Sequence, residues 1–237
     1  MSLSIVLTCY DEVPKIFRSY ERIVRLMDLT KIDYEVVVVD DGSQEPARAE
    51  LAGYFRDRPG VRLVLSDRNE GRGAAVSKGI AASRKDYVAS IDTDLQIPEH
   101  HLFALYDAAL KERADMILGH RHYVLGMKPY HWLRYVCSRA YRRFADLILG
   151  LGGLDTETGI KMYRREAFLP VLESVEDKRW FWDTESVAEG LRRGLSVLQV
   201  PVFVIRRGDA STVRVFRDTY RYVSSLYRYR KRRNRHG

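Results

Sequence analysis

The stretch that decides the fold is YVASIDTDLQIPEHH, residues Tyr87–His101. It begins as a short run of β-prone and small residues, typical of a buried strand, and the run stops at Asp92. Asp94 follows, with Gln96 and Pro98 beyond it. Side chains alternate between the two faces of a strand, so Asp92 and Asp94 can converge only if the chain turns there. We therefore predict a buried strand that ends in a polar turn.

Two carboxylates on such a turn are suited to a hard divalent cation. Mg²⁺ and Mn²⁺ favour a few protein oxygens combined with phosphate oxygens, and Gln96 supplies a neutral oxygen nearby. We predict that Asp92, Asp94 and Gln96 bind a metal ion that also contacts a diphosphate. The alternative is a pair of acids in a solvated turn, because an Asp-x-Asp sequence alone is a weak signal.

Polar groups also follow other strand-like runs in the first 120 residues. Near-continuous apolar strands separated by helices predict an α/β fold with a mostly parallel sheet covered on both faces. Ligands of such sheets bind at the carboxyl ends of the strands, where the sequence places residues 8–12, 40–43 and 92–94. Strands are expected at residues 3–8, 34–39, 61–66, 87–91 and 115–119, and helices at residues 13–29 and 71–83.

The second half of the chain is less regular. Residues 130–149 and the acidic stretch FWDTESVAEG show helical spacing, and residues 195–205 are strand-like. No repeat or low-complexity linker separates them. We therefore expect one catalytic domain over residues 1–211 and a C-terminal extension over residues 212–237.

The extension carries most of the charge. Residues 206–237 contain eleven Lys and Arg against two Asp, a net charge of +9, whereas the whole chain has +8. On a helix, Phe216, Tyr220, Val223 and Tyr227 fall on one side and the arginines mainly on another. A basic amphipathic helix of this kind is typical of a membrane surface. The alternatives are a helix packed on the domain and a solvated terminus; nucleic-acid binding is not expected, since no other basic surface is apparent.

Other features limit the class of protein. No apolar run approaches the ~18 residues that a membrane-spanning helix needs. The N-terminus lacks the basic region and cleavage site of a signal peptide. Cys9 and Cys137 are isolated and are expected to be packing residues in a reducing compartment. We expect a cytoplasmic protein, peripheral at the cytoplasmic face of a membrane.

Several motifs occur in an order that resembles a known family. They are IVLTCYDE, VVVVDDGS, NEGRGAAVSKGI, DTDLQIP, GHR and DTETGIKMYRREAF. Together they resemble a family 2 glycosyltransferase of the Rossmann-like GT-A fold, over residues 2–212. Within that family they are similar to the polyprenyl-phosphate (dolichol-phosphate) mannosyl- and glucosyltransferases. The resemblance implies inverting transfer of a hexose, mannose favoured and glucose next, from GDP-mannose or UDP-glucose to a polyprenyl or dolichyl phosphate, with Mg²⁺ or Mn²⁺ as cofactor.

The resemblance also assigns the donor side of the site. Asp92, Asp94 and Gln96 would bind the metal ion on the donor diphosphate. Some of the other assignments have simpler alternatives: a turn or cap for Asp41, an ordinary loop for the glycines, and a cap or ion pair for Glu185. The residues expected to contact the nucleotide sugar are Thr8, Tyr10, Glu12, Asp40, Asp41, Gly71, Gly73, Asp92, Lys161 and Glu185.

On the acceptor side the resemblance assigns mainly arginines. Arg121 would lie near the transferred group, and Arg206 would also serve catalysis, together with the metal-binding Asp94. Arg134 and Ser138 lie one helical turn apart and resemble the family's acceptor-phosphate pair. Guanidinium suits phosphate because it is planar and always charged. The alternative for Arg134 is a surface charge on a helix.

Two other functions remain open at the level of sequence. One is a soluble member of the same family that transfers sugar to a hydroxyl of a sugar or protein. The other is a nucleotide-sugar-binding protein without catalysis, against which the intact Asp-x-Asp argues. For the membrane enzyme, a separate membrane-anchoring subunit is a possible further partner.

Overall fold

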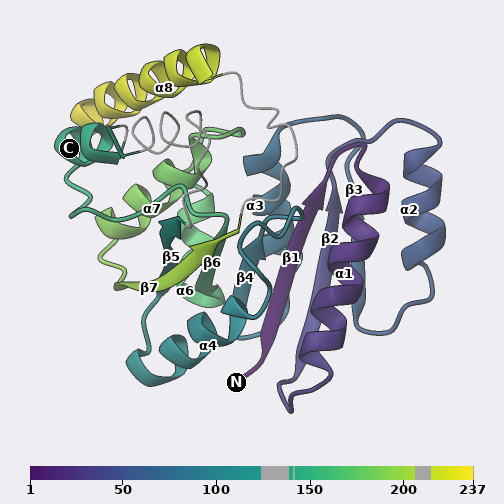
Figure 1. Ribbon diagram of the computed structural model, residues 1–237. Helices are drawn as coiled ribbons and strands as arrows, with labels where there is room; N and C mark the ends of the chain where they lie inside the picture. Colours follow the sequence, from purple (N-terminus) through teal and green to yellow (C-terminus); the bar gives the residue numbers. More distant parts are fainter. Residues whose placement is uncertain (124–138, 141, 206–214, 237) are drawn as a thin grey trace.

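The computed structural model describes residues 1–123, 139–140, 142–205 and 215–236 (Figure 1). In this part of the chain, seven strands form one sheet in the order β3-β2-β1-β4-β6-β5-β7. All neighbouring pairs are parallel except the two made by β6, which runs antiparallel to β4 and β5. The predicted mostly parallel sheet is therefore confirmed. The strands are β1 (Leu3–Cys9), β2 (Tyr34–Asp40), β3 (Val61–Leu65), β4 (Tyr87–Ile91), β5 (Met116–Tyr123), β6 (Ile160–Arg164) and β7 (Val197–Val204).

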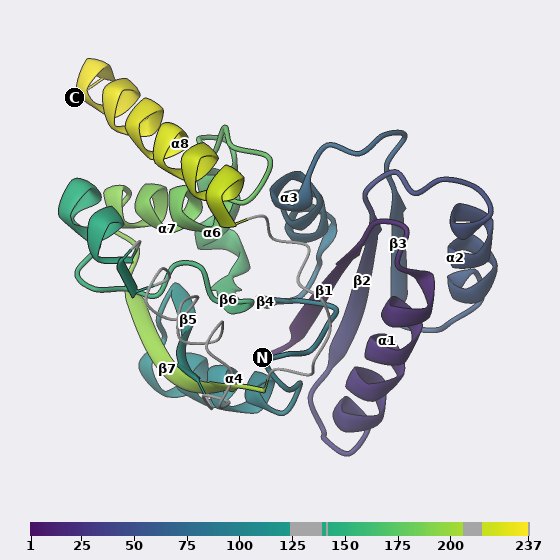
Figure 2. The ribbon, with the colours of Figure 1, turned by 45° about the horizontal axis from the view of Figure 1, so that its top comes forward.

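Helices cover both faces of this sheet (Figures 1 and 2). Side chains of α1, α2 and α4 belong to the core on one face, and side chains of α3, α6 and α7 to the core on the other. The bounds of these helices are α1 (Val13–Met27), α2 (Ala47–Phe55), α3 (Arg72–Ala82), α4 (His101–Glu112), α6 (Arg165–Leu172) and α7 (Trp182–Arg192), and a further helix, α8, spans Val215–His236.

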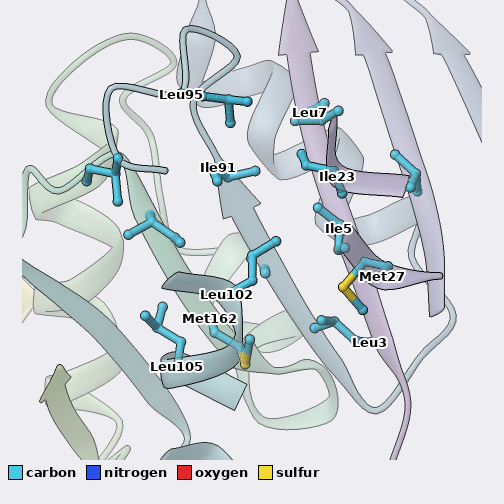
Figure 3. Close-up of a cluster of buried hydrophobic side chains, with 14 of the residues drawn as sticks. Leu3, Ile5, Leu7, Ile23, Met27, Ile91, Leu95, Leu102, Leu105 and Met162 are labelled. Atoms are coloured by element: carbon cyan, nitrogen blue, oxygen red, sulfur yellow. The ribbon is translucent and has the colours of Figure 1, made fainter. Parts of the chain in front are cut away.

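Strand β2 shows why the central strands are almost entirely apolar. Val36 and Val38 pack into one core, while Val37 and Val39 pack into the other. Both faces of a parallel strand are buried in this layered fold, so both sets of alternating side chains must be apolar. Figure 3 shows part of the first core, where residues of β1, α1 and α4 meet.

Helix α8 lies outside the two main cores, on a third and smaller one. Leu226 and Tyr229 are buried there with Phe181 of the loop before α7 and with Ala145 and Leu149. The last two belong to a helical stretch at residues 142–149. Within the ranges that the structure describes, no helix is both long and apolar enough to cross a bilayer.

Cys9 lies at the end of β1 and behaves as a packing residue. Its side chain is buried, and its thiol donates to the carbonyl oxygen of Val39 at 3.8 Å. Burial, followed by the charges of Asp40 and nearby acids, raises the pKa of Cys9 to about 12. A thiol with that pKa is unreactive at neutral pH.

Candidate active site

The carboxyl ends of the strands surround a polar cavity of about 130 Å³. Three of its residues, Asp92, Asp94 and Gln96, come from the turn after β4, and Arg121 comes from β5. The structure therefore brings the predicted metal-binding residues and one predicted acceptor residue to the same place. The full lining is Ile91, Asp92, Asp94, Gln96, Ile97, Arg121, Tyr123, Glu157, Gly159 and Val204.

The turn that gathers the acids depends on Leu95. Its φ of 47° is in the left-handed region, which non-glycine residues seldom adopt. The Leu95 amide donates to the Asp92 carbonyl at 3.0 Å, and its side chain is buried in the core (Figure 3). Burial of this side chain offsets the cost of the backbone conformation, about 1 kcal/mol or more. The result is that Asp92, Asp94 and Gln96 all line the cavity.

Asp94 carries the least constrained carboxylate of the pair. It accepts hydrogen bonds from the Gln96 amide at 3.1 Å and from Gln96 Nε2 at 2.9 Å. Loss of hydration, and then the like charge of Asp92, raise the pKa of Asp94. A divalent cation between the two acids would remove that repulsion.

The chemistry of the cavity fits a cation shared with a phosphate ligand. Among the residues that the structure describes, no cluster of three or more His, Cys, Asp or Glu could hold a metal ion. In the described part of the chain, the turn after β4 thus offers a few oxygens, from Asp92, Asp94 and Gln96. Mg²⁺ and Mn²⁺ bind readily to such partial shells when phosphate oxygens complete them.

Asp92 is fixed by Arg72, a residue to which the sequence assigned no role. Arg72 Nε and Nη2 lie 3.1 and 2.6 Å from Asp92 Oδ1, and Nη1 lies 2.7 Å from Asp183 Oδ2. Asp183 also forms an ion pair with the buried Lys161. Burial lowers the pKa of Lys161, and the charge of Asp183 opposes that shift. Lys161, predicted to contact the donor, is therefore held in an internal ion pair behind the cavity.

Gly159 makes room for the Asp92 carboxylate. A Cβ atom at Gly159 would lie 2.3 Å from Asp92 Oδ2. The Asp92 amide donates to the Gly159 carbonyl at 2.9 Å, which extends the β4–β6 ladder beyond Ile91 and Ile160. Arg72 on one side and Gly159 on the other thus leave Asp92 little freedom.

Arg121 is oriented by Asp155, which the sequence matched to the family but did not place in the site. Arg121 Nε and Nη2 lie 2.9 and 2.6 Å from the two carboxylate oxygens of Asp155. Burial opposes ionisation of Asp155, but the charge and hydrogen bonds of Arg121 outweigh it and lower the pKa of Asp155. Glu157 lies 3.7 Å from Arg121 Nη2, and burial raises the pKa of Glu157.

The predicted nucleotide residues on β1 and β2 line the same end of the sheet. Asp40 is fully buried, and its carboxylate accepts hydrogen bonds from the Ser43 amide at 3.2 and 3.1 Å. Asp41 accepts from the amides of Glu70 and Gly71 at 3.0 and 2.9 Å. These contacts shape the loops, as the alternative for Asp41 expected. Contact of either acid with a nucleotide stays a prediction.

Three further donor-side residues precede α1. Tyr10 is exposed, Glu12 pairs with Lys15 at 2.7 Å, and the Thr8 carbonyl accepts a hydrogen bond from Thr93 Oγ1 at 3.0 Å. Thr8 therefore ties β1 to the turn after β4. Contact of these residues with the donor stays a prediction.

Gly71 and Gly73 are required by packing at the start of α3. Gly71 has a φ of 113°, and a Cβ there would lie 2.4 Å from the carbonyl oxygen of Lys178. A Cβ at Gly73 would lie 2.4 Å from Cβ of Trp182. These contacts hold α3 against the start of α7, and they place Arg72 between Asp92 and Asp183.

Glu185 lies away from the cavity. Its carboxylate accepts a hydrogen bond from the Asp177 amide at 2.8 Å and forms an ion pair with Arg232 of α8. The structure therefore favours the cap and ion-pair alternative for Glu185. The remaining acceptor residues predicted from the sequence, Arg134, Ser138 and Arg206, lie outside the described residues.

Comparison with known families agrees with this geometry. The profile described as Glycosyl transferase family 2 matches residues 4–171. The chain belongs to this family. The family 2 chain is 32% identical over 232 residues to the glycosyltransferase AglD of Haloferax volcanii, covering 96% of the chain and 37% of that relative. It is 24% identical to a dolichyl-phosphate beta-glucosyltransferase of Dictyostelium discoideum, covering 84% and 65%.

A third relative is the polyprenol monophosphomannose synthase of Mycolicibacterium smegmatis. It is 29% identical over 180 residues, covering 73% of the chain and 67% of the synthase. The chain thus spans only part of these curated relatives, as little as 37% of the length of AglD.

Solved structures confirm the predicted GT-A fold. Glucosyl-3-phosphoglycerate synthase from Mycobacterium tuberculosis, in complex with Mn²⁺, UDP and glucosyl-3-phosphoglycerate, superposes with a TM-score of 0.72 at 19% identity, covering 97% of the chain and 79% of the synthase. Mannosyl-3-phosphoglycerate synthase from Rubrobacter xylanophilus gives 0.67 at 18% identity, covering 100% and 74%.

Proposed function

We propose that this family 2 glycosyltransferase transfers a hexose from a nucleotide sugar to a polyprenyl phosphate at a membrane surface, with mannose favoured over glucose. The observation that carries the proposal is the cavity lined by Asp92 and Asp94 and, beside them, by the guanidinium of Arg121, which Asp155 orients. Such a cavity suits two phosphorylated substrates, one bound through a cation and one through an arginine. The names of the Dictyostelium and Mycolicibacterium relatives support the lipid acceptor.

The donor would bind through its diphosphate. Asp92, Asp94 and Gln96 are the residues that would hold Mg²⁺ or Mn²⁺, which when bound supplies a Lewis acid for the leaving diphosphate. Arg72 keeps Asp92 in place for this role. The solved relatives that contain Mn²⁺ and UDP support the same donor chemistry.

The acceptor would react without a strong base. A lipid phosphate is already ionised at neutral pH, so its oxygen can attack the anomeric carbon directly. A new bond forms from that carbon to the phosphate oxygen while the bond to the diphosphate breaks, and the configuration inverts. Arg121 would position the phosphate against the charge of the donor, and Arg134, Ser138 and Arg206 are proposed to help.

A second candidate is favoured by Glu157. This carboxyl group lines the cavity, and burial raises its pKa, which makes its carboxylate a stronger base. A base is needed when the acceptor is a hydroxyl of a sugar or protein. The second candidate is therefore transfer to a hydroxyl, with Glu157 accepting the proton.

The deciding experiment is sugar transfer in vitro. Radiolabelled GDP-mannose or UDP-glucose is incubated with the chain, Mn²⁺ or Mg²⁺, and a detergent-dispersed short polyprenyl phosphate. We expect chloroform-soluble label from one donor, and none when the polyprenol lacks its phosphate. Donor binding without a lipid product, also after membranes are added to supply an anchoring subunit, would contradict the lipid acceptor and direct the search to hydroxyl acceptors.

A further inference from the structure

Helix α8 is a fixed part of the fold. Leu226 is fully buried, and the Tyr229 ring lies 6.0 Å from that of Phe181. The Tyr229 hydroxyl donates to Glu189 of α7 at 2.8 Å, and Arg232 forms an ion pair with Glu185. Helix α8 is thus anchored along one face between Leu226 and Arg232, and the opposite face has a constant orientation relative to the cavity.

That opposite face of α8 combines apolar and basic groups. Val223 and Tyr227, one turn apart, are 38% and 68% exposed. Arg230 and Lys231 are exposed as well. With a helical rotation of about 100° per residue, Arg230 falls on one side of the stripe formed by Val223 and Tyr227, and Lys231 falls on the other. Long basic side chains beside an apolar stripe can extend to lipid headgroups while the stripe contacts the acyl boundary.

A second helical stretch packs beside α8 and also exposes apolar side chains. Residues 142–149 pack on α8 through Ala145 and Leu149, which share the small core with Leu226. Their other side exposes Phe144 at 43% and Leu147 at 84%. Exposed large apolar side chains on two adjoining helices indicate an interaction surface rather than isolated surface residues.

The position of the two helices relates the surface to the cavity. Strands β1 and β2 point toward the side of the molecule on which α8 lies (Figure 1), and the second view agrees (Figure 2). The cavity lies at the carboxyl end of β4, which is parallel to β1. A flat partner in contact with α8 would therefore lie at the end of the sheet where the cavity is, the end toward which β1 and β4 point.

We propose that α8 and residues 142–149 form a docking surface for an anionic lipid bilayer, and that docking turns the cavity toward the bilayer. We name this surface, made of Phe144, Leu147, Val223, Tyr227, Arg230 and Lys231, the docking face. Its positive charge is complementary to an anionic membrane, and the region from residue 206 onward carries the net charge of +9. The biological meaning of this orientation rests on the proposed function, but lipid binding itself does not.

The test measures lipid binding without any donor. The purified chain is sedimented with vesicles of two compositions. One is phosphatidylcholine alone, and the other is phosphatidylcholine with about 30% phosphatidylglycerol, which supplies the anionic charge that attracts basic helices. We expect binding to the anionic vesicles only, weakened at least about tenfold by the double change Val223→Glu and Tyr227→Glu. Leu147→Glu should weaken it as well. Leu29→Glu is the matched control, because Leu29 is 85% exposed and follows the far end of α1.

The outcomes separate this proposal from its competitors. Equal binding of the double variant and the wild type would overturn the docking face, as would equal binding to both kinds of vesicle. If Leu147→Glu behaves like Leu29→Glu, the second helix is not part of the surface. Wild-type dimers that the double variant loses, without vesicle binding, would assign the face to a second copy of the chain instead. Transfer by the wild type to a detergent-dispersed acceptor tests the proposed function separately.

Discussion

At the scale of single residues, Asp92 and Asp94 differ in what holds them. Asp92 is fixed between Arg72 and Gly159, whereas Asp94 is exposed and accepts its hydrogen bonds from the neighbouring Gln96. An exposed carboxylate is the one that a cation can approach most easily. We therefore expect Asp94 to be a direct ligand, with Asp92 shaping the turn around it.

The first prediction concerns Asp94→Asn. This change removes the charge and keeps the shape, so Mn²⁺ binding in the presence of a nucleoside diphosphate should be lost and turnover should fall on the order of 100-fold or more. Electron paramagnetic resonance of free Mn²⁺ measures the binding directly. Asp107→Asn, in an exposed pair with Lys111, is the control and should change neither. Retained Mn²⁺ affinity in Asp94→Asn would refute the assignment.

The second prediction concerns Gly159→Ala. The added methyl group would collide with Asp92 Oδ2, so the turn must shift, at a cost of about 1–3 kcal/mol in the free energy of unfolding. Metal affinity should fall with it. Gly53→Ala is the matched control, because a Cβ at Gly53 in α2 has nothing within 4 Å. Urea unfolding of both variants checks this, and similar stability of the two would show that Asp92 can move freely.

At the scale of elements, the site depends on how α3 meets α7. Arg72 begins α3 and forms an ion pair with Asp92. Asp183 lies in the first turn of α7 and forms an ion pair with Lys161. A guanidinium at a helix N-terminus is unfavourable by the helix dipole alone, so the two carboxylates must compensate. This network makes the helices and the metal-binding turn one unit.

The third prediction is a double-mutant cycle on that network. Arg72→Met removes the guanidinium that Asp92 and Asp183 share and should lower the free energy of unfolding by about 3 kcal/mol. Adding Asp183→Asn should cost less than the sum of the single changes, because the two residues interact. The exposed pair Lys85–Asp33 provides the control cycle, with a coupling of less than about 1 kcal/mol. Additive effects of Arg72 and Asp183 would contradict the coupling.

The fourth prediction concerns pH and the junction of β5, β6 and β7. Asp115 accepts hydrogen bonds from the Ser196 amide at 2.9 Å and from Arg164 Nε at 2.8 Å. Burial opposes ionisation, but the Ser196 and Arg164 hydrogen bonds prevail and lower the pKa of Asp115. The stabilisation is therefore present above the unfolded pKa of about 3.9 and is lost as pH falls through the folded value.

Asp115→Asn should consequently lower the free energy of unfolding at pH 7 by about 1–2 kcal/mol. The difference from the wild type should shrink as the pH falls below 4, where the wild-type carboxyl becomes protonated too. Urea unfolding of both proteins at pH values from roughly 3 to 7 measures how this difference in the free energy of unfolding changes with pH. A difference that does not change with pH would assign the effect to packing.

The elements also show how far sequence reasoning reaches. The buried strands β1, β2 and β4 were predicted within a residue or two, because apolar runs closed by acids are a strong signal. Helix α2 was not predicted, since only Leu51 and Phe55 are buried on it. The antiparallel direction of β6 was not predicted either, because an apolar run looks the same in both directions.

The candidate site likewise contains residues that the sequence predicts and residues that it does not. The residues of the turn after β4 are close in sequence, and their pattern alone indicated a metal site. Arg72 and Asp183 are 111 positions apart, and no local pattern relates them. Asp155 and Arg121 are likewise joined only by the folded sheet.

At the scale of the whole molecule, α8 joins the sheet and its covering helices to the proposed membrane surface. The helix is attached through the small core around Leu226 and through the Arg232–Glu185 ion pair, while the sheet itself makes its two larger cores without it. We therefore expect α8 to be the less stable unit, able to detach before the sheet unfolds.

The fifth prediction follows from that attachment. Leu226→Ala should leave a cavity in the small core and destabilise the attachment of α8 by about 2–4 kcal/mol. Hydrogen exchange should then be faster in α8 and unchanged in β1, β2 and β4. Val223→Ala, on the exposed face, is the control. Faster exchange throughout the sheet would show that α8 and the domain unfold together.

The order of β5 and β6 has a consequence for how such enzymes can diversify. Strand β5 ends at Tyr123 and β6 begins at Ile160, yet the two are paired neighbours. The chain between them leaves the sheet at the cavity and returns to it at the cavity, where Tyr123 and Gly159 both line the wall. The end of this connection is fixed by the site, because Asp155 orients Arg121 and Gly159 confines Asp92. Sequence changes before Asp155 can therefore alter the proposed acceptor side while the register of both strands and the position of Asp92 are kept.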